Sequence, residues 1–187
     1  MPLFGFQNSN GKSIPIIHII GLPGSGKTTL ARKLSKAVQV SVLCIDRLRT
    51  RFPQTPIGEA DAWIALFREL SRHRWKNCIL ETTGLNRREE FLRTALPFGQ
   101  VFTIKLDASR KTLFTRIRKK KKRERGGRWF YGAEYRNKYE FVRKLFKHFH
   151  QIPANCHINT NGLTRAAVYL LAIKETNMLK KTGVTCQ

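Results

Sequence analysis

Residues 19–34 read IIGLPGSGKTTLARKL. An apolar run ends at Gly21, a loop of small residues follows, and Lys27 opens a segment with helical periodicity. Gly21 to Thr28 fits the pattern G-x-x-x-x-G-K-[ST] completely, between a predicted strand and a predicted helix. Glycines let the backbone N–H groups converge on anionic oxygens, and a helix N-terminus adds its positive end. The stretch therefore predicts a phosphate-binding loop.

The chemistry of this loop predicts ATP with Mg²⁺ as the bound cofactors. Lys27 supplies a positive charge to the β- and γ-phosphates, and the Thr28 hydroxyl is the expected metal ligand. The histidines and cysteines show no metal-binding spacing, so the only metal expected is the Mg²⁺ that the nucleotide brings. The residues expected to bind the nucleotide are Gly21, Pro23, Gly24, Ser25, Gly26, Lys27, Thr28 and Thr29.

Strand and helix patterns alternate along the chain, which is typical of an α/β protein with a parallel sheet. Apolar runs predict strands over residues 14–20, 40–45, 77–80, 101–106 and 156–159. Periodicity predicts helices over 27–38, 58–76, 86–96 and 165–179. Two further helices are expected, one from 109 into a charged run and one along an aromatic stripe at 135–149. We expect that stripe to be core rather than a base-stacking platform. The expected fold is a three-layer P-loop NTPase or kinase fold, with a five-stranded parallel sheet and helices on both faces.

A chain of 187 residues is most simply one domain, with a core over about 14–179 and a basic helical lid over about 116–132. Its 36 Lys and Arg against 12 Asp and Glu give a net charge of +24. Residues 110–147 alone hold sixteen basic residues and three glutamates. Such a field attracts polyanions, so we predict a nucleic acid or another polyanion as partner. The alternative is a solubilising surface charge.

Targeting and membrane signals are not recognisable in the sequence. No apolar run approaches the roughly 20 residues of a membrane span, and residues 1–13 lack a signal-peptide pattern. The four cysteines have no C-x-x-C spacing, which favours reduced thiols. We expect a cytoplasmic protein without membrane contact.

Two further motifs narrow the class of nucleotide-binding protein. We find no N-K-x-D-type guanine motif, and the segment CILETTGLNRRE offers a single acid, Glu81, where motor ATPases place a pair. Together with Asp46-x-x-Arg49, these motifs resemble the small P-loop kinases of the nucleoside-monophosphate-kinase-like group. The closest similarity in motif is to polynucleotide 5′-hydroxyl kinase domains, through Asp46-x-x-Arg49 and the turn at 83–88. Zeta-type toxins share an Asp at position 46 and a turn similar to 81–84.

The resemblance implies roles on the acceptor side. Asp46 is the candidate base for an acceptor hydroxyl, and the alternative is a helix N-cap. Arg49 would hold an acceptor phosphate or carboxylate bidentately, unless it is a solvated surface residue. Glu81 would join the Mg²⁺ shell through water or orient the acceptor. Thr82, Asn86 and Arg87 would line the acceptor pocket, with loop capping as the alternative.

The resemblance also implies a lid that closes over the transferring phosphate. Arg116 matches the first lid arginine, while the second cation is open among Arg118, Lys120, Arg123, Arg125 and Arg128. The surplus of basic residues suggests a groove for nucleic acid, in which Trp129–Tyr131 would stack a base or else pack the lid hinge. The turn at 159–164 would contact adenine.

We therefore expect an ATP-dependent phosphotransferase, with the 5′-hydroxyl of a polynucleotide as the favoured acceptor. One alternative is a kinase for a small molecule: a nucleotide, sugar acid, sugar nucleotide or antibiotic. The other is a nucleic-acid-binding NTPase module without kinase turnover.

Overall fold

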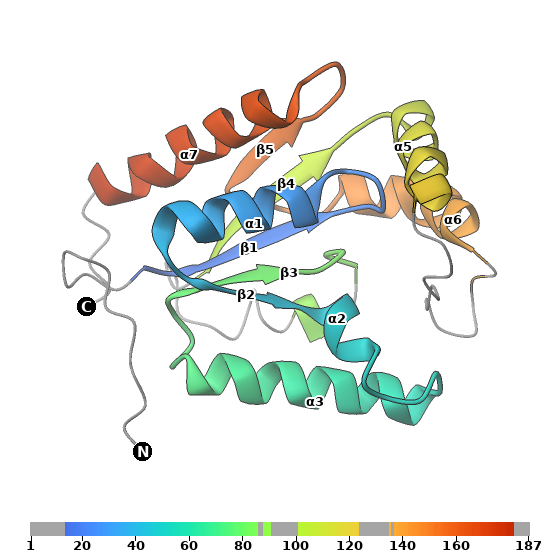
Figure 1. Ribbon diagram of the computed structural model, residues 1–187, viewed down its shortest axis with the longest axis horizontal. Coiled ribbons are helices and arrows are strands. Elements are labelled where there is room, and N and C mark those ends of the chain that lie inside the picture. Colours follow the sequence, from blue (N-terminus) through green and yellow to red (C-terminus); the bar gives the residue numbers. More distant parts are fainter. Residues whose placement is uncertain (1–13, 86–87, 91–100, 124–134, 136, 182–187) are drawn as a thin grey trace.

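The computed structural model describes residues 14–85, 88–90, 101–123, 135 and 137–181 (Figure 1). The strands are β1 (Ile16–Gly21), β2 (Ser41–Cys44), β3 (Cys78–Glu81), β4 (Val101–Asp107) and β5 (Cys156–Asn159). The helices are α1 (Lys27–Val38), α2 (Ile45–Arg49), α3 (Pro56–Arg72), α5 (Arg110–Arg123), α6 (Lys138–His150) and α7 (Arg165–Lys181).

The five strands form one parallel sheet in the order β2-β3-β1-β4-β5, which confirms the predicted fold class. β1 lies at the centre, and all six of its residues are buried. Its neighbours β3 and β4 lie on opposite sides, so the order of the chain reverses at β1. Ligands of such sheets bind at the carboxyl ends of the strands near this reversal. The phosphate loop follows β1 and is therefore placed at that point.

Helices cover both faces of the sheet and complete three layers (Figure 1). On one face, α1 and α7 pack on the sheet through a cluster that includes Leu30, Leu34 and Ala172. On the other face, α2 and α3 pack through a cluster that includes Leu48 and Trp63. Each helix turns a stripe of apolar residues toward the sheet, as the 3.6-residue period requires.

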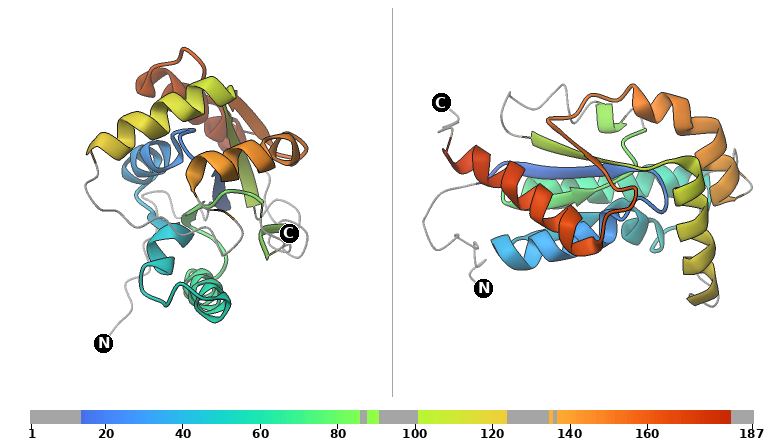
Figure 2. Two further views of the ribbon diagram at one scale, coloured as in Figure 1. Left: turned by 90° about the vertical axis from the view of Figure 1, so that its right-hand side faces the viewer. Right: turned by 90° about the horizontal axis from the view of Figure 1, so that it is seen from above.

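A third apolar cluster lies at the carboxyl edge of the sheet, between α5, α6 and the phosphate loop. The left view of Figure 2 faces this edge and shows α5 and α6 beside the strand ends. Val142 and Phe149 of the aromatic stripe are fully buried, and Tyr139 meets Phe114 edge to face at 5.4 Å. The stripe is core, as predicted. Tyr135, however, precedes α6, which begins after the capping residue Asn137.

One helix prediction was wrong at its ends, and one short helix was missed. The helix predicted over 58–76 is α3, which begins at Pro56 behind the capping residue Thr55 and ends at Arg72. It ends there because Arg74, Trp75 and Asn77 adopt left-handed φ angles of 53° to 54°. The short helix α2 was not predicted. The helix predicted over 86–96 lies mostly outside the described residues, of which 88–90 are helical.

Within the described residues, no helix combines the length and apolarity needed to cross a membrane. No three or more His, Cys, Asp or Glu side chains among them lie close enough together to hold a metal ion by themselves.

A buried lysine ties β4 to the end of α6. Lys105 has no exposed surface, and its Nζ donates to the carbonyls of His150 at 2.9 Å and Ile152 at 3.0 Å. Burial lowers the pKa of Lys105 below its ordinary value, and the charge of Asp107 partly counteracts this. We expect Lys105→Met to leave both carbonyls unpaired and to lower the free energy of unfolding by about 1–3 kcal/mol. Urea denaturation measures this loss, with exposed Lys111→Met as the control; equal stabilities of the two variants would contradict it.

Candidate active site

The phosphate loop connects β1 to α1 in the expected conformation. Gly26 is the N-cap of α1 with φ of 105°, and Gly24 has φ of 84°, so both occupy left-handed conformations that favour glycine. A Cβ on Gly24 would meet the Leu113 carbonyl oxygen at 2.9 Å, whereas the space beside Gly26 is open. The loop is thus packed against α5 on one side and open where an anion would meet the first N–H groups of α1.

The predicted nucleotide-binding residues therefore lie together. Gly21 ends β1, Pro23, Gly24 and Ser25 form the loop, and Lys27, Thr28 and Thr29 begin α1. The Lys27 side chain lies across the loop, with its Nζ 3.3 Å from the Leu22 carbonyl oxygen.

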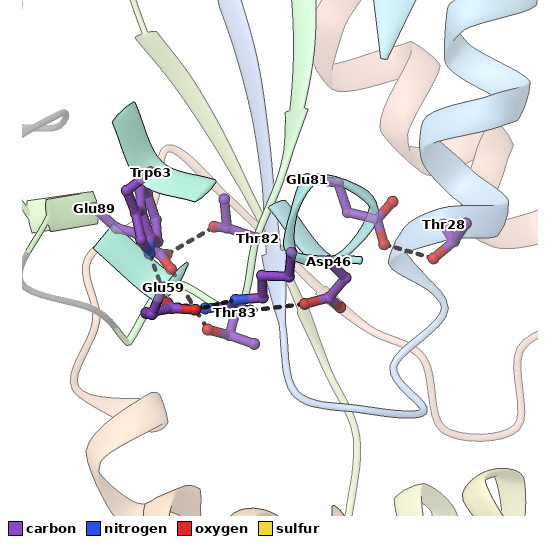
Figure 3. A network of polar contacts seen from close by, with 9 residues as sticks. Thr28, Asp46, Glu59, Trp63, Glu81, Thr82, Thr83 and Glu89 are labelled. Atoms are coloured by element: carbon purple, nitrogen blue, oxygen red, sulfur yellow. Dashed lines mark hydrogen bonds and ion pairs between the residues drawn. The ribbon is translucent and has the colours of Figure 1, made fainter. Parts of the chain in front are cut away.

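Thr28 and Glu81 form the pair that fits a nucleotide-bound cation. The Thr28 Oγ1 donates to Glu81 Oε1 at 2.5 Å (Figure 3). Glu81 is only 4% exposed, and its Oε2 has no hydrogen-bond partner within the described chain. A buried carboxylate oxygen without a partner is costly unless a ligand satisfies it. A hydroxyl and a carboxylate beside a phosphate loop are the oxygen donors that Mg²⁺ prefers, so these residues fit the ion.

Asp46 lies on the neighbouring strand end. In the sheet register, Cys44 and Ile19 both pair with Glu81, so β2 and β3 end level with each other and β1 continues to Gly21 beside them. Asp46 follows two residues after Cys44, in the first turn of α2, and its side chain is 51% exposed. The N-cap of α2 is Cys44, so the alternative of Asp46 as a helix cap is wrong. The sheet brings the candidate base to the same edge as the phosphate loop.

Arg49 joins Asp46 to α3. Its Nη1 donates to Asp46 Oδ1 at 2.7 Å, while its Nε and Nη2 donate to the two oxygens of Glu59 at 2.8 and 2.6 Å. Trp63 Nε1 donates to Glu59 Oε1 at 2.8 Å. Burial alone would lower the pKa of Arg49, but the bonds and charges of Glu59 and Asp46 outweigh it and raise that pKa. Burial would raise the pKa of Glu59, but the bonds from Arg49 and Trp63 lower it.

The structure places Arg49 differently from the acceptor-binding role that the resemblance implies, and that role stays a prediction. The two-nitrogen edge expected to grip an acceptor anion is occupied by the carboxylate of Glu59. Nor is Arg49 a solvated surface residue, because its side chain is only 13% exposed. Its observed place is that of a connector between α2 and α3.

Thr82 is also placed differently from the prediction. Its hydroxyl donates to Glu89 Oε2 at 2.7 Å and lies 2.8 Å from Nε2 of His18, and all three residues are buried. Thr82 is therefore part of an internal polar chain rather than an open pocket wall. His18 is therefore a hydrogen-bonded core histidine. Asn86 and Arg87 lie outside the described residues.

Arg116, the predicted lid arginine, lies in the middle of α5 and is held by hydrogen bonds. It donates to the Thr160 hydroxyl at 2.8 Å and carbonyl at 2.7 Å, and Nη1 lies 3.4 Å from the Gly24 carbonyl. Burial lowers the pKa of Arg116 below its ordinary value. Arg116 thus ties the phosphate loop to the 159–164 turn, the segment expected beside adenine.

The rest of the predicted lid lies at the limit of the described chain. Arg118 is an exposed residue of α5. Lys120 and Arg123 lie within α5, but only their backbone is described. Arg125, Arg128 and Trp129–Tyr131 lie outside the described residues, so the second lid cation and the aromatic stacking stay predictions.

Cys44 allows a test of this edge of the sheet. Burial, with the charges of Glu81 and Asp46, raises the pKa of the Cys44 thiol from 9.0 to about 12. The reactive thiolate is therefore about a thousandfold scarcer than in a free cysteine at the same pH, since each pKa unit is a factor of ten. We expect Cys44 to resist a thiol reagent at mildly alkaline pH in the folded protein and to react after unfolding, followed by peptide mass spectrometry. Rapid labelling of folded protein would contradict this environment.

Four residues of the network were not singled out from sequence: Glu59, Trp63, Glu89 and Thr160. The only signal available was Glu59 and Trp63 at i and i+4, which places them on one helix face. Their partners come from other segments, so local pattern could not reveal them.

Comparisons with known proteins agree with this geometry. The model of an AAA domain family, AAA_33, matches residues 16–129. The chain belongs to this family. A shikimate kinase from Corynebacterium diphtheriae is 41% identical over 49 residues, which are 26% of this chain and 28% of that relative. The chain thus matches less than a third of the length of that curated relative.

Solved structures with the same fold cover almost the whole chain. A gluconokinase from Sinorhizobium meliloti has a TM-score of 0.64 at 15% identity, covering 90% of this chain and 94% of its own. Shikimate kinase from Acinetobacter baumannii, solved with shikimate, has a TM-score of 0.61 at 18% identity, covering 92% and 96%. The chain therefore has the α/β P-loop kinase fold of these structures.

Proposed function

We propose that this chain transfers the γ-phosphoryl group of Mg²⁺-bound ATP to a hydroxyl group, and that the acceptor is a small molecule. The observation that carries the proposal is the position of Asp46. It lies one strand away from the Thr28–Glu81 pair, at the same edge of the sheet as Lys27. A phosphate loop alone would serve a switch or a motor equally well. A half-exposed carboxylate on the neighbouring strand end is what a phosphotransferase adds.

The chemistry requires an in-line nucleophile, charge neutralisation and exclusion of water. Asp46 accepts the proton of the acceptor hydroxyl, whose oxygen bonds to the γ-phosphorus. The bond from that phosphorus to the bridging oxygen breaks, and its electron pair leaves with ADP. Lys27 neutralises charge on the phosphates. Thr28 and Glu81 would hold Mg²⁺, which when bound neutralises further phosphate charge.

Support for a small acceptor comes from the named relatives, which are shikimate and gluconate kinases. The sequence-based expectation of a polynucleotide 5′-hydroxyl as acceptor depends partly on Arg49, whose bidentate edge is occupied by Glu59. The polynucleotide remains a second candidate because of the +24 charge, to which exposed basic residues of α5 and α6 contribute. A module without turnover has less support, since it would not need Asp46.

The proposal is tested by offering γ-labelled ATP and Mg²⁺ with three acceptor pools: sugars and sugar acids including shikimate and gluconate, nucleosides and nucleoside monophosphates, and 5′-hydroxyl oligonucleotides. Label in either small-molecule pool supports the proposal. Label only on oligonucleotides moves the acceptor to the second candidate. In that case, affinity for the oligonucleotide should fall steeply between about 50 and 200 mM salt. ATP bound without label in any pool contradicts the proposal.

A further inference from the structure

We propose that Glu59 is a positioning residue for the reaction: by occupying one edge of Arg49, it limits Arg49 to a single hydrogen bond with Asp46. Oδ2 of Asp46 then stays available for the acceptor hydroxyl. This inference rests on the proposed function, because it takes Asp46 as the base.

The geometry of the guanidinium carries the first step. An arginine beside a carboxylate tends to form two parallel bonds, which would engage both oxygens. Here both bonds of the Nε and Nη2 edge go to Glu59, at 2.8 and 2.6 Å. Only Nη1 reaches Asp46, at Oδ1 and 2.7 Å. In the part of the chain that the structure describes, Oδ2 of Asp46 has no hydrogen-bond partner.

The charges of Arg49, Asp46 and Glu59 give a second reason for a positioning role of Glu59. An arginine with a single carboxylate partner directs its whole charge at that carboxylate. Glu59 places a second negative charge on the same guanidinium, so Arg49 is shared between two carboxylates. Arg49 then fixes the direction of Asp46 while its attraction is divided.

The packing of α3 holds Glu59 in place. Trp63, one turn along α3 and 1% exposed, donates to Glu59 from within the core. Gly58 lies against the preceding turn, where a Cβ would come within 2.0 Å of the Pro53 carbonyl oxygen. Thr55 caps the helix by accepting from Gly58 N at 3.1 Å. The first turn of α3 is therefore fixed, and Glu59 with it.

The test compares Glu59→Gln with Glu69→Gln, a matched change on the same helix. Glu69 pairs with Arg72 at 2.6 Å, in the last part of α3, whereas Glu59 lies in its first turn. With shikimate, gluconate and a 5′-hydroxyl oligonucleotide as acceptors, we expect Glu59→Gln to lower kcat about tenfold, within the usual range for coupled neighbours. KM for ATP stays unchanged, and Glu69→Gln behaves as the parent protein.

A double variant separates positioning from a general loss of structure. If Glu59 acts through Asp46, adding Glu59→Gln to Asp46→Asn reduces kcat no further. If the two losses multiply, or if KM for ATP rises instead of kcat falling, the proposal is overturned.

A measurement independent of turnover separates failure of this inference from failure of the proposed function. The chain has three aspartates, Asp46, Asp61 and Asp107, so ¹³Cγ-labelled aspartate gives a simple NMR spectrum, assigned with Asp46→Asn. At neutral pH, we expect the Asp46 signal to move in Glu59→Gln and not in Glu69→Gln. A signal that does not move overturns the positioning role. If the signal moves but the protein labels no acceptor, the contact of Glu59 with the Arg49–Asp46 pair stands and the proposed function is refuted instead.

Discussion

Replacing Lys27 with alanine is expected to abolish phosphoryl transfer, with kcat/KM falling by at least about a hundredfold, the usual scale for one preorganised charge-stabilising group. The loss is large because Lys27 is 8% exposed and lies across the loop, where low polarity strengthens its attraction to phosphate. Label transfer from ATP measures the rate, and titration calorimetry measures ATP affinity.

Lys36→Ala is the matched control, because Lys36 is a surface residue in the last turn of the same helix. It should leave transfer unchanged. Equal activities of the Lys27 and Lys36 variants would mean that the loop does not act on the transferred phosphate.

Asp46→Asn is expected to reduce kcat by about 10²–10⁴-fold while ATP binding persists, because an amide keeps the shape but accepts no proton. The phosphate loop and the Thr28–Glu81 pair do not depend on Asp46, so the nucleotide site should survive. Single-turnover label transfer measures the loss, alongside ATP affinity.

Asp61→Asn, the same substitution at a partly buried aspartate of α3, is the control for the substitution itself. If the Asp46→Asn protein transfers phosphate as fast as the parent protein, Asp46 is not the base. A parallel loss of ATP binding would make Asp46 part of the nucleotide site instead.

The phosphate loop and the sheet could be predicted because their signals are local. The glycines and Lys27 are contiguous, and buried parallel strands appear as short apolar runs. The predicted end of α3 came too late because Trp75 continues the apolar spacing of the helix. In the structure the helix has already ended there, and Trp75 has a left-handed φ of 54°. Local spacing does not encode that turn.

The acceptor side could be predicted only in part. Asp46 was found because it follows a strand at a fixed distance from the loop. The partner of Arg49 could not be found, because Glu59 lies ten residues away on another helix and meets it only after both pack on the sheet. A motif shows that an arginine is present, whereas tertiary packing decides which carboxylate it binds.

The stoichiometry of transfer distinguishes a kinase from an ATP hydrolase at this site. ADP and phosphorylated acceptor are quantified in the same reaction, with γ-labelled ATP, Mg²⁺ and each acceptor pool. The account predicts one phosphorylated acceptor for each ADP formed, and neither product with the Lys27→Ala protein. ADP released with inorganic phosphate and no phosphorylated acceptor in any pool would contradict it, because the site would then hydrolyse ATP without serving a kinase.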